Sequence, residues 1–325
     1  FPGIVLVHGG GGTAFAKWTE IYAKRGYAAI AMDLGGKWLP QQSDQPEKAA
    51  VRLPDGGPAA DDQTKFAPTE PPHRDQWTYH AVADVILAHS LLRSFSEVDA
   101  DRVGLTGISW GGYLTCIVAG VDSRFKAAVP QYGCGFLRDN SVWKTSWFEP
   151  PKFGQEWAEE WIKLWDPASY VGLAKMPILF INGAQDFAYP LDSYAKTYAL
   201  VRSAKNISVQ PKLGHGHMFE VKEVHQFLDS RLKGAPGLAR VSAVKIVGQQ
   251  VTAAVEDSPK PKYANLQYTT GPHSENRTRP WISSSMEING TVIAGQAPPA
   301  AATAWYISVE DEHGSLVSSE LQIKE

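Results

Sequence analysis

Short apolar runs and amphipathic segments alternate along the first two thirds of the chain. Residues 4–7 are apolar at every position and lead into a glycine-rich stretch, which is typical of a buried parallel strand feeding a loop. Residues 18–25 have helical spacing and precede Gly26, and the apolar run 27–32 predicts a second strand. This alternation predicts an α/β fold, with a mainly parallel sheet covered by helices on both faces.

The same pattern continues to residue 232. The expected further strands are 103–106, 125–130, 177–181 and 207–211, and the expected helices are 77–95, a helix ending at 120, 191–203 and 221–232. Two segments interrupt the alternation. Residues 35–76 lack periodicity, which predicts a surface excursion near a site, and residues 136–170 form an insertion that contains five tryptophans.

The pattern changes after residues 233–237, whose Lys-Gly-Ala-Pro-Gly sequence predicts a linker. Beyond it no helical period is found, and Pro, Gly and Asn turns separate short alternating runs. These runs are 243–247, 251–255, 266–268, 282–288, 303–309 and 317–323. Six or seven short strands in this length predict a β-sandwich. The expected domains are therefore 1–234 and 235–325.

Composition limits the classes of partner. The 325 residues carry 31 Lys+Arg and 34 Asp+Glu, and 43% of them are hydrophobic, as in an ordinary globular protein. A net charge of −3 argues against nucleic acid or an anionic membrane surface as partner, since both favour a basic face. The chain has no apolar run of the ~20 residues that cross a bilayer. Because Phe1 leads straight into a strand, we expect the natural chain to start earlier, and we expect a secreted or periplasmic location.

The sharpest chemical signal is Gly107-Ile108-Ser109-Trp110-Gly111, a G-x-S-x-G between a predicted strand and a predicted helix. At such a turn the serine is strained, and the flanking glycines avoid clashes with neighbouring backbone. A G-x-S-x-G string alone arises often by chance, and its structural alternative is a tight turn. The strand–turn–helix setting favours Ser109 as a nucleophile.

A serine nucleophile needs a base and an orienting acid. Asp186 follows the predicted strand 177–181, and His215 follows the strand 207–211, so the order Ser, Asp, His fits an elbow of this type. His217 is a second candidate base. A glycine on each side of His215 suits an exposed loop and favours that residue. An oxyanion also needs donors, for which Gly10, Gly11 and Trp110 can supply backbone N–H groups.

These motifs give the chain a family resemblance. Residues 4–232 resemble an α/β-hydrolase, and Gly107–Tyr113 is similar to the nucleophile elbow of acetyl xylan esterase-like and prolyl-oligopeptidase-like hydrolases. The His-Gly-Gly-Gly-Gly stretch at 8–12 and Gly214-His215-Gly216 lean toward the carbohydrate esterases. The resemblance implies a serine esterase that removes acetyl or related acyl groups from carbohydrate, with an acylated carbohydrate or another small ester as its substrate. It implies an acyl-enzyme on Ser109 and no cofactor.

The tryptophan-rich insertion falls where such hydrolases often carry a cap over the site, so Trp143 and Trp147 are candidate substrate contacts. Core packing is the alternative for these side chains. Metal-binding motifs such as H-E-x-x-H or C-x-x-C are absent from the sequence. Two other functions stay open: a serine peptidase of the prolyl-oligopeptidase type, and a carbohydrate-binding protein with a vestigial triad.

Overall fold

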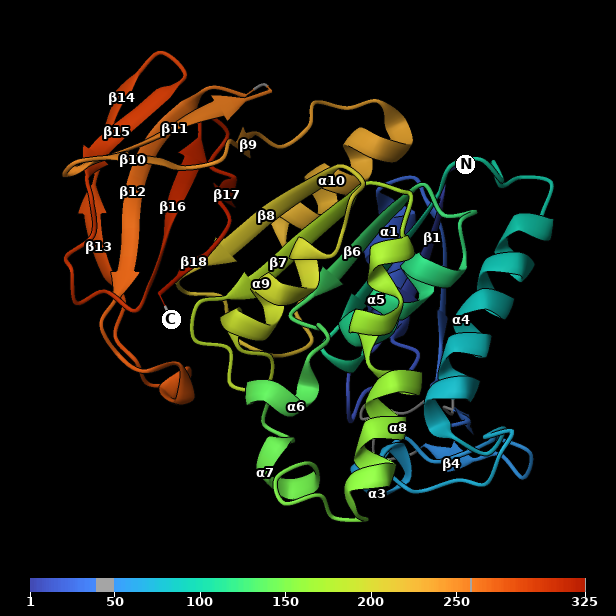
Figure 1. Cartoon of the computed structure of the whole chain (residues 1–325). Coiled ribbons are helices and arrows are strands. Elements are labelled where there is room, and N and C mark those ends of the chain that lie inside the picture. The colour runs from blue at the N-terminus through green and yellow to red at the C-terminus, as the bar shows by residue number, and fades with distance from the viewer. Residues whose placement is uncertain (39–49, 258, 325) are drawn as a thin grey trace.

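A six-stranded parallel sheet forms the centre of the first part of the chain (Figure 1). The computed structural model describes residues 1–38, 50–257 and 259–324. The sheet has the strand order β2-β1-β5-β6-β7-β8, and each neighbouring pair is parallel. Its strands are β1 (Gly3–Val7), β2 (Ala28–Met32), β5 (Val103–Ile108), β6 (Ala127–Gln131), β7 (Ile178–Gly183) and β8 (Lys205–Gln210). The predicted α/β class is confirmed.

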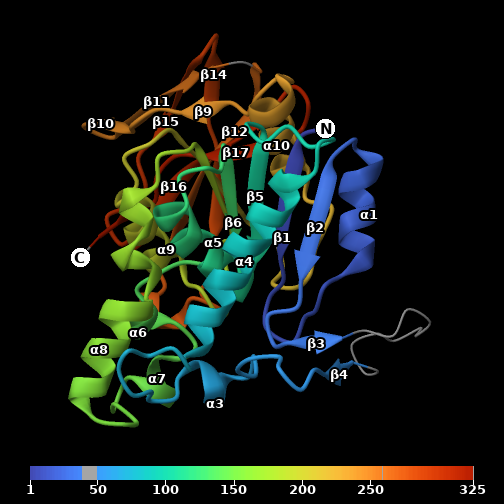
Figure 2. The same ribbon diagram turned by 90° about the vertical axis from the view of Figure 1, so that its right-hand side faces the viewer.

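Helices cover both faces of this sheet, and Figure 2 shows α1 and α4 beside β2. Strand β1 shows why both faces are covered: Val5 and Val7 pack into one core, whereas Ile4 and Leu6 pack into the other, and all four are fully buried. Helices α4 (Trp77–Ser94), α5 (Trp110–Val121) and α9 (Leu191–Ala199) cover the first face. Helices α1 (Ala16–Lys24) and α10 (Lys222–Lys233) cover the second.

The two segments that interrupt the alternation pack against each other. The first contains β3 (Lys37–Trp38), β4 (Val51–Arg52) and α3 (Asp62–Lys65), and its residues 39–49 lie outside the described part of the chain. The second contains α6 (Leu137–Asn140), α7 (Lys144–Trp147), α8 (Gln155–Trp165) and the 3-10 turns η1 (Pro167–Ser169) and η2 (Val171–Leu173).

A buried aromatic side chain joins these two segments. Phe66 is fully buried and its ring contacts the rings of Trp147 and Trp161. The sequence predicts residues 35–76 as a surface excursion, and this is wrong for the end of the segment. Phe66 alone anchors the end of this segment in the core, and a single buried residue produces no periodic pattern in the sequence.

The C-terminal part consists of two antiparallel sheets, in agreement with the predicted all-β region. One sheet has the order β10-β11-β15-β14 with β9 on β11, and the other has the order β13-β12-β16-β17 with β18 on β16. The strands are β9 (Arg240–Val241), β10 (Lys245–Val247), β11 (Gln250–Glu256), β12 (Pro261–Thr269), β13 (Ile282–Ser285), β14 (Glu287–Asn289), β15 (Val292–Gln296), β16 (Ala304–Asp311), β17 (Leu316–Ser318) and β18 (Gln322–Ile323). Strand β15 is absent from the predicted runs, because Ile293 is the one buried side chain in it.

The two parts of the chain meet along the last strand of the parallel sheet. Helix α10 ends at Lys233, and Gly234 follows in a left-handed conformation with φ 70°. Strand β17 lies along β8, where Ser208 Oγ donates to the Leu316 carbonyl at 2.6 Å and Ser318 Oγ accepts from the Val209 N–H at 3.0 Å. The C-terminal sheets therefore cover an edge of the parallel sheet (Figure 1). No described helix has the length and apolar character needed to cross a membrane.

Candidate active site

Four loops at the carboxyl ends of parallel strands carry the predicted site residues. The loop after β1 holds Gly10 and Gly11, and the turn after β5 holds Ser109. Asp186 follows β7, and His215 follows β8. Because the strands run parallel, their carboxyl ends lie at one edge of the sheet, which brings residues far apart in the sequence into one site.

Ser109 lies on a sharp turn between β5 and α5 with φ 58° and ψ −118°, and a positive φ is uncommon for a side-chain-bearing residue. The turn depends on its two flanking glycines. A Cβ at Gly107 would lie 2.1 Å from the Gly111 carbonyl oxygen, and a Cβ at Gly111 would lie 2.0 Å from that of Val7. Only glycine fits either position, as the sequence motif predicts.

Ser109, His215 and Asp186 form one chain of hydrogen bonds. Ser109 Oγ lies 2.8 Å from His215 Nε2, and His215 Nδ1 lies 2.6 Å from Asp186 Oδ2. An ionised carboxylate can only accept, so Nδ1 carries the proton and Nε2 is left to accept from the serine hydroxyl. Asp186 Oδ1 accepts from the backbone N–H groups of Ala188 and Tyr189 at 2.9 and 2.8 Å. The three side chains have the arrangement that activates a serine.

The second histidine, His217, has a different neighbour. Its Nε2 accepts the N–H of Gly9 at 3.1 Å, while His8 Nδ1 lies 2.7 Å from the Gly9 carbonyl oxygen. Two histidines thus hold Gly9, at the start of the turn that contains Gly10 and Gly11. The N–H of Gly9 donates to His217. Within the described chain, the N–H groups of Gly10 and Gly11 donate no hydrogen bond. These two N–H groups remain available to an oxyanion.

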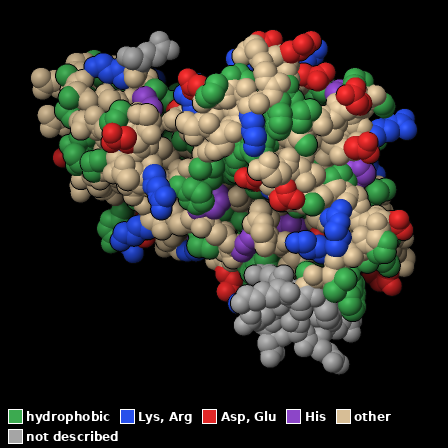
Figure 3. Space-filling model, turned by 90° about the horizontal axis from the view of Figure 1, so that it is seen from below, with side chains coloured by type: hydrophobic (Ala, Val, Ile, Leu, Met, Phe, Trp, Pro, Cys, Tyr) green, Lys and Arg blue, Asp and Glu red, His purple; other side chains and the backbone are tan. Residues whose placement is uncertain are grey.

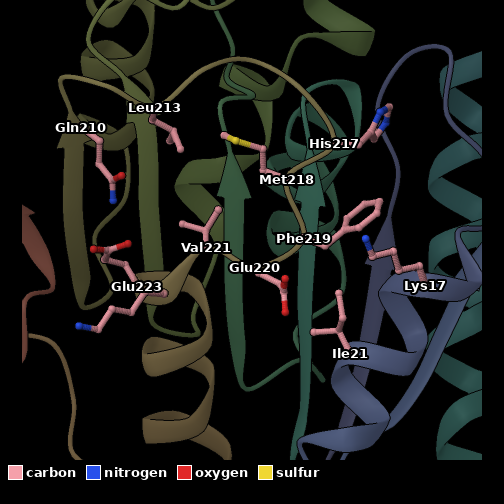
Figure 4. Close-up of a pocket in the computed structure, with 11 residues that line it drawn as sticks. Lys17, Ile21, Gln210, Leu213, His217, Met218, Phe219, Glu220, Val221 and Glu223 are labelled. Carbon is pink, nitrogen blue, oxygen red and sulfur yellow. The ribbon is translucent and has the colours of Figure 1, made fainter.

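His217 also lines a cavity of about 500 Å³ (Figure 4). This cavity lies beside the loop that carries His215 and His217. In this view His217 and Phe219 lie near Lys17 of α1. Ser109 and His215 do not line this cavity, which is therefore separate from the triad.

His8 is buried, and its Nε2 accepts the Leu34 N–H at 2.9 Å. Burial lowers its pKa to about 4, from an ordinary value of 6.5. Between pH 6.5 and 4 the unfolded chain therefore binds more protons at this residue than the native one. The free energy of unfolding should fall as the pH is lowered through this window, by on the order of 3 kcal/mol at pH 4.

We expect His8→Gln to remove this contribution, so that its unfolding free energy changes less between pH 7 and pH 4 than that of the wild type. Denaturant unfolding at a series of pH values measures the difference. His313→Gln, which changes an exposed histidine, is the control. Parallel curves for the wild type and His8→Gln would contradict the assignment.

A cavity of about 540 Å³ opens onto the triad. Trp143 lines it together with Ser109 and His215, so this predicted substrate contact lies at the cavity. Trp147 does not line it. Its indole is buried, stacks on Phe66 and has the Lys152 ammonium 3.9 Å from its ring centroid. The placement of Trp147 gives it a packing role, because its indole faces the aromatic core between the two interrupting segments.

The structure adds polar residues that the sequence analysis missed. Lys65 lines the cavity, is buried, and lies 4.7 Å from the Trp110 ring centroid and 3.2 Å from Asp62. Burial lowers the pKa of Lys65, and the attraction of Asp62 opposes this shift. Asp62 also accepts from Trp143 Nε1 at 2.9 Å. No sequence signal marked these residues, since they lie in the segment without periodicity.

Two aromatic rings hold His215. Tyr132 lies 4.8 Å and Phe187 lies 4.9 Å from the imidazole, measured between ring centroids. The Tyr132 hydroxyl donates to the Gly216 carbonyl oxygen, which fixes the loop beside the histidine. A signal for Tyr132 did exist, because it directly follows the carboxyl end of β6.

The face drawn in Figure 3 bears Lys, Arg, Asp, Glu and His side chains interspersed, without a continuous patch of one charge. Within residues 1–38, 50–257 and 259–324, no group of three or more His, Cys, Asp or Glu residues is placed to hold a metal ion.

Comparison with known proteins places these features in a family context. Residues 72–232 match the prolyl oligopeptidase family. An uncharacterized peptidase, YuxL, from Bacillus subtilis (strain 168) is 26% identical in an alignment of 215 residues that covers 62% of this chain and 28% of that protein. This chain therefore spans less than a third of that relative.

Two solved structures share the fold. An acetyl xylan esterase from Paenibacillus sp. R4 has a TM-score of 0.56 at 23% identity, covering 71% of this chain and 75% of that one. The acylaminoacyl peptidase of Pyrococcus horikoshii has a TM-score of 0.53 at 22% identity, covering 71% and 37%. TM-scores above 0.5 show a common fold, whereas identities this low leave the substrate open.

Proposed function

We propose that this chain, a serine hydrolase of the α/β-hydrolase fold related to the prolyl oligopeptidase family, is a carboxylic-ester hydrolase that removes acetyl groups from carbohydrate. The observation that carries the proposal is the hydrogen-bonded chain from Ser109 through His215 to Asp186, which ends at a cavity. The same machinery can cleave esters or amides, so the choice of substrate rests on the cavity.

The proposed reaction proceeds through an acyl-enzyme. Ser109 Oγ attacks the ester carbonyl carbon while His215 Nε2 takes the hydroxyl proton, and Asp186 stabilises the imidazolium that forms. The N–H groups of Gly10, Gly11 and Trp110 bind the developing oxyanion. His215 then protonates the departing sugar oxygen. Water repeats the cycle on the acyl-enzyme and releases acetate, which restores the Ser109 hydroxyl.

Two properties of the cavity support a carbohydrate ester. Its lining mixes carboxylates and ammonium groups with two indoles, and polar groups beside an aromatic face suit a sugar ring. The polar side chains are those of Asp33, Lys37, Asp61, Asp62 and Lys65, and the indoles are those of Trp110 and Trp143. The proposal includes a secreted or periplasmic location, where an acylated polysaccharide would be accessible. Polysaccharide degradation would be the wider process.

A serine peptidase is the second candidate. The match of residues 72–232 to the prolyl oligopeptidase family and the similarity to the uncharacterized peptidase YuxL favour it. A carbohydrate-binding protein with a vestigial triad receives no such support, because Ser109 and His215 lie at hydrogen-bond distance and line an open cavity.

A substrate panel tests the proposal: acetylated xylan, cephalosporin C, a feruloyl ester, p-nitrophenyl acetate and a proline peptide. We expect release of acetate from xylan with a kcat/KM at least tenfold above that for the peptide amide. Cleavage of the peptide with no release of acetate from acetylated sugars would favour the peptidase. Lack of turnover, together with failure of a fluorophosphonate probe to label Ser109, would support the binding protein.

A further inference from the structure

The loop between β12 and β13, residues 270–281, reaches from the C-terminal sheets to the loop that carries Asp186. Three consecutive residues of the acid loop bond to it. Trp281 Nε1 donates to the Ala184 carbonyl at 3.1 Å, and Gln185 Nε2 donates to the Arg279 carbonyl at 2.9 Å. Asn276 Nδ2 donates to the carbonyl oxygen of Asp186 itself at 2.5 Å. The acid loop is therefore held from outside the parallel sheet.

The groups that make these contacts are buried and fixed in turn. Asn276 is 7% exposed and Arg279 is 1% exposed. Arg279 Nη2 donates to Asn276 Oδ1 at 3.1 Å, and its Nη1 lies 3.0 Å from His273 Nδ1. Because a guanidinium can only donate, Asn276 Oδ1 faces Arg279 and its amide hydrogens face Asp186. The orientation of the asparagine is therefore set by the loop.

The same loop also reaches the rim of the active-site cavity. The guanidinium of Arg277, an exposed side chain, lies 5.7 Å from the ring centroid of Phe187. Phe187 lines the cavity and packs against the His215 ring. The β12–β13 loop thus contacts both Asp186 and the residue that follows it.

We propose that the C-terminal β-sheets are a positioning part of the active site, in which Asn276 and Trp281 set the backbone of the acid loop so that Asp186 meets His215. This inference rests on the proposed serine-hydrolase mechanism but not on the choice of substrate. An acid that orients a base must be held to within a fraction of an ångström, and a displacement of about 1 Å can cost about 100-fold in rate. Asn276 is a positioning residue, since it touches the backbone of Asp186 and not the reacting atoms.

Asn276→Asp is the sharpest test in the full-length chain. It keeps an oxygen for Arg279 but places a second acceptor against the Asp186 carbonyl, so the two oxygens repel. We expect kcat to fall about 10- to 100-fold with KM changed less than about twofold, because the acid acts on the chemical step. The control is Asn289→Asp, the same chemical change at an exposed position of β14.

Two further readouts separate positioning from general destabilisation. The rate of fluorophosphonate labelling of Ser109 should fall in parallel with kcat, whichever substrate the enzyme takes. The downfield proton resonance of the His215–Asp186 hydrogen bond should shift or vanish in Asn276→Asp and persist in Asn289→Asp. If the wild type labels readily but does not deacetylate sugars, the proposed function fails while this inference can still be judged.

Trp281→Phe keeps most of the ring contact with Tyr306 and removes the donor to Ala184, so it tests the inference if Asn276→Asp does not fold. We expect its labelling rate to fall about 3- to 10-fold. Labelling within twofold of the Asn289→Asp control in every folded variant would overturn the proposal. So would a lower kcat with an unchanged downfield resonance, since the effect would then not pass through Asp186.

Discussion

Replacing Ser109 with alanine should lower kcat/KM for p-nitrophenyl acetate by about 10⁴-fold or more and leave the fold intact. Its hydroxyl is the group within 2.8 Å of His215 Nε2, so the change removes the nucleophile. Alanine at position 109 would adopt the same φ of 58° as serine does, so the substitution adds no backbone strain to the turn. Initial rates and thermal unfolding measure the two effects.

The matched control is Ser94→Ala, at an exposed position near the end of α4, which should retain wild-type rates. Ser109→Ala should also lose fluorophosphonate labelling. Hydrolysis by Ser109→Ala within a few fold of the wild type would show that another residue is the nucleophile, and the proposed mechanism would fail with it.

The second large effect is expected at Asp186, where Asp186→Asn should lower kcat by about 10³- to 10⁴-fold. The environment decides how the new amide sits. Two backbone N–H groups, from Ala188 and Tyr189, point at Oδ1 and require an oxygen there. The amide nitrogen of the asparagine must then face His215 Nδ1, and it can only donate.

His215 would consequently carry its proton on Nε2, the nitrogen that has to accept the proton of Ser109. The loss should lie in kcat rather than KM, because substrate contacts are unchanged. Steady-state kinetics measure the effects on kcat and KM separately. The control is Asp139→Asn, the same chemical change at a residue that forms an ion pair with Lys196. A variant with kcat within tenfold of the wild type would show that Asp186 does not orient the base.

The sequence was sufficient for the parallel sheet, and it singled out Ser109, Asp186 and a histidine of the 213–217 loop as residues that should meet. Each signal is local: an apolar run such as residues 4–7, two glycines around Ser109, and polar residues just after a strand. A parallel sheet converts those local signals into proximity, because it collects the carboxyl ends of its strands at one edge. Local sequence could not decide whether His215 or His217 is the base. That depends on the tertiary structure, in which the His215 ring faces Ser109 and the His217 ring faces Gly9.

Other features were decided by tertiary packing alone. Lys65 and Phe66 lie in a stretch without periodicity, yet both are buried, because the aromatic insertion closes over them. Trp143 reaches the cavity and Trp147 does not, although the two indoles are four residues apart. The sequence carries the residue types, whereas the direction of each side chain depends on partners far along the chain.

The bond from Asn276 to Asp186 spans 90 residues and joins the C-terminal sheets to the triad. No pattern within either segment foretells it. Periodicity and motifs report how a residue relates to its near neighbours, so the sequence by itself determined the fold class and named candidate residues for the site. Contacts between distant loops arise only when the packed elements bring them together, and they decided what holds the acid in place.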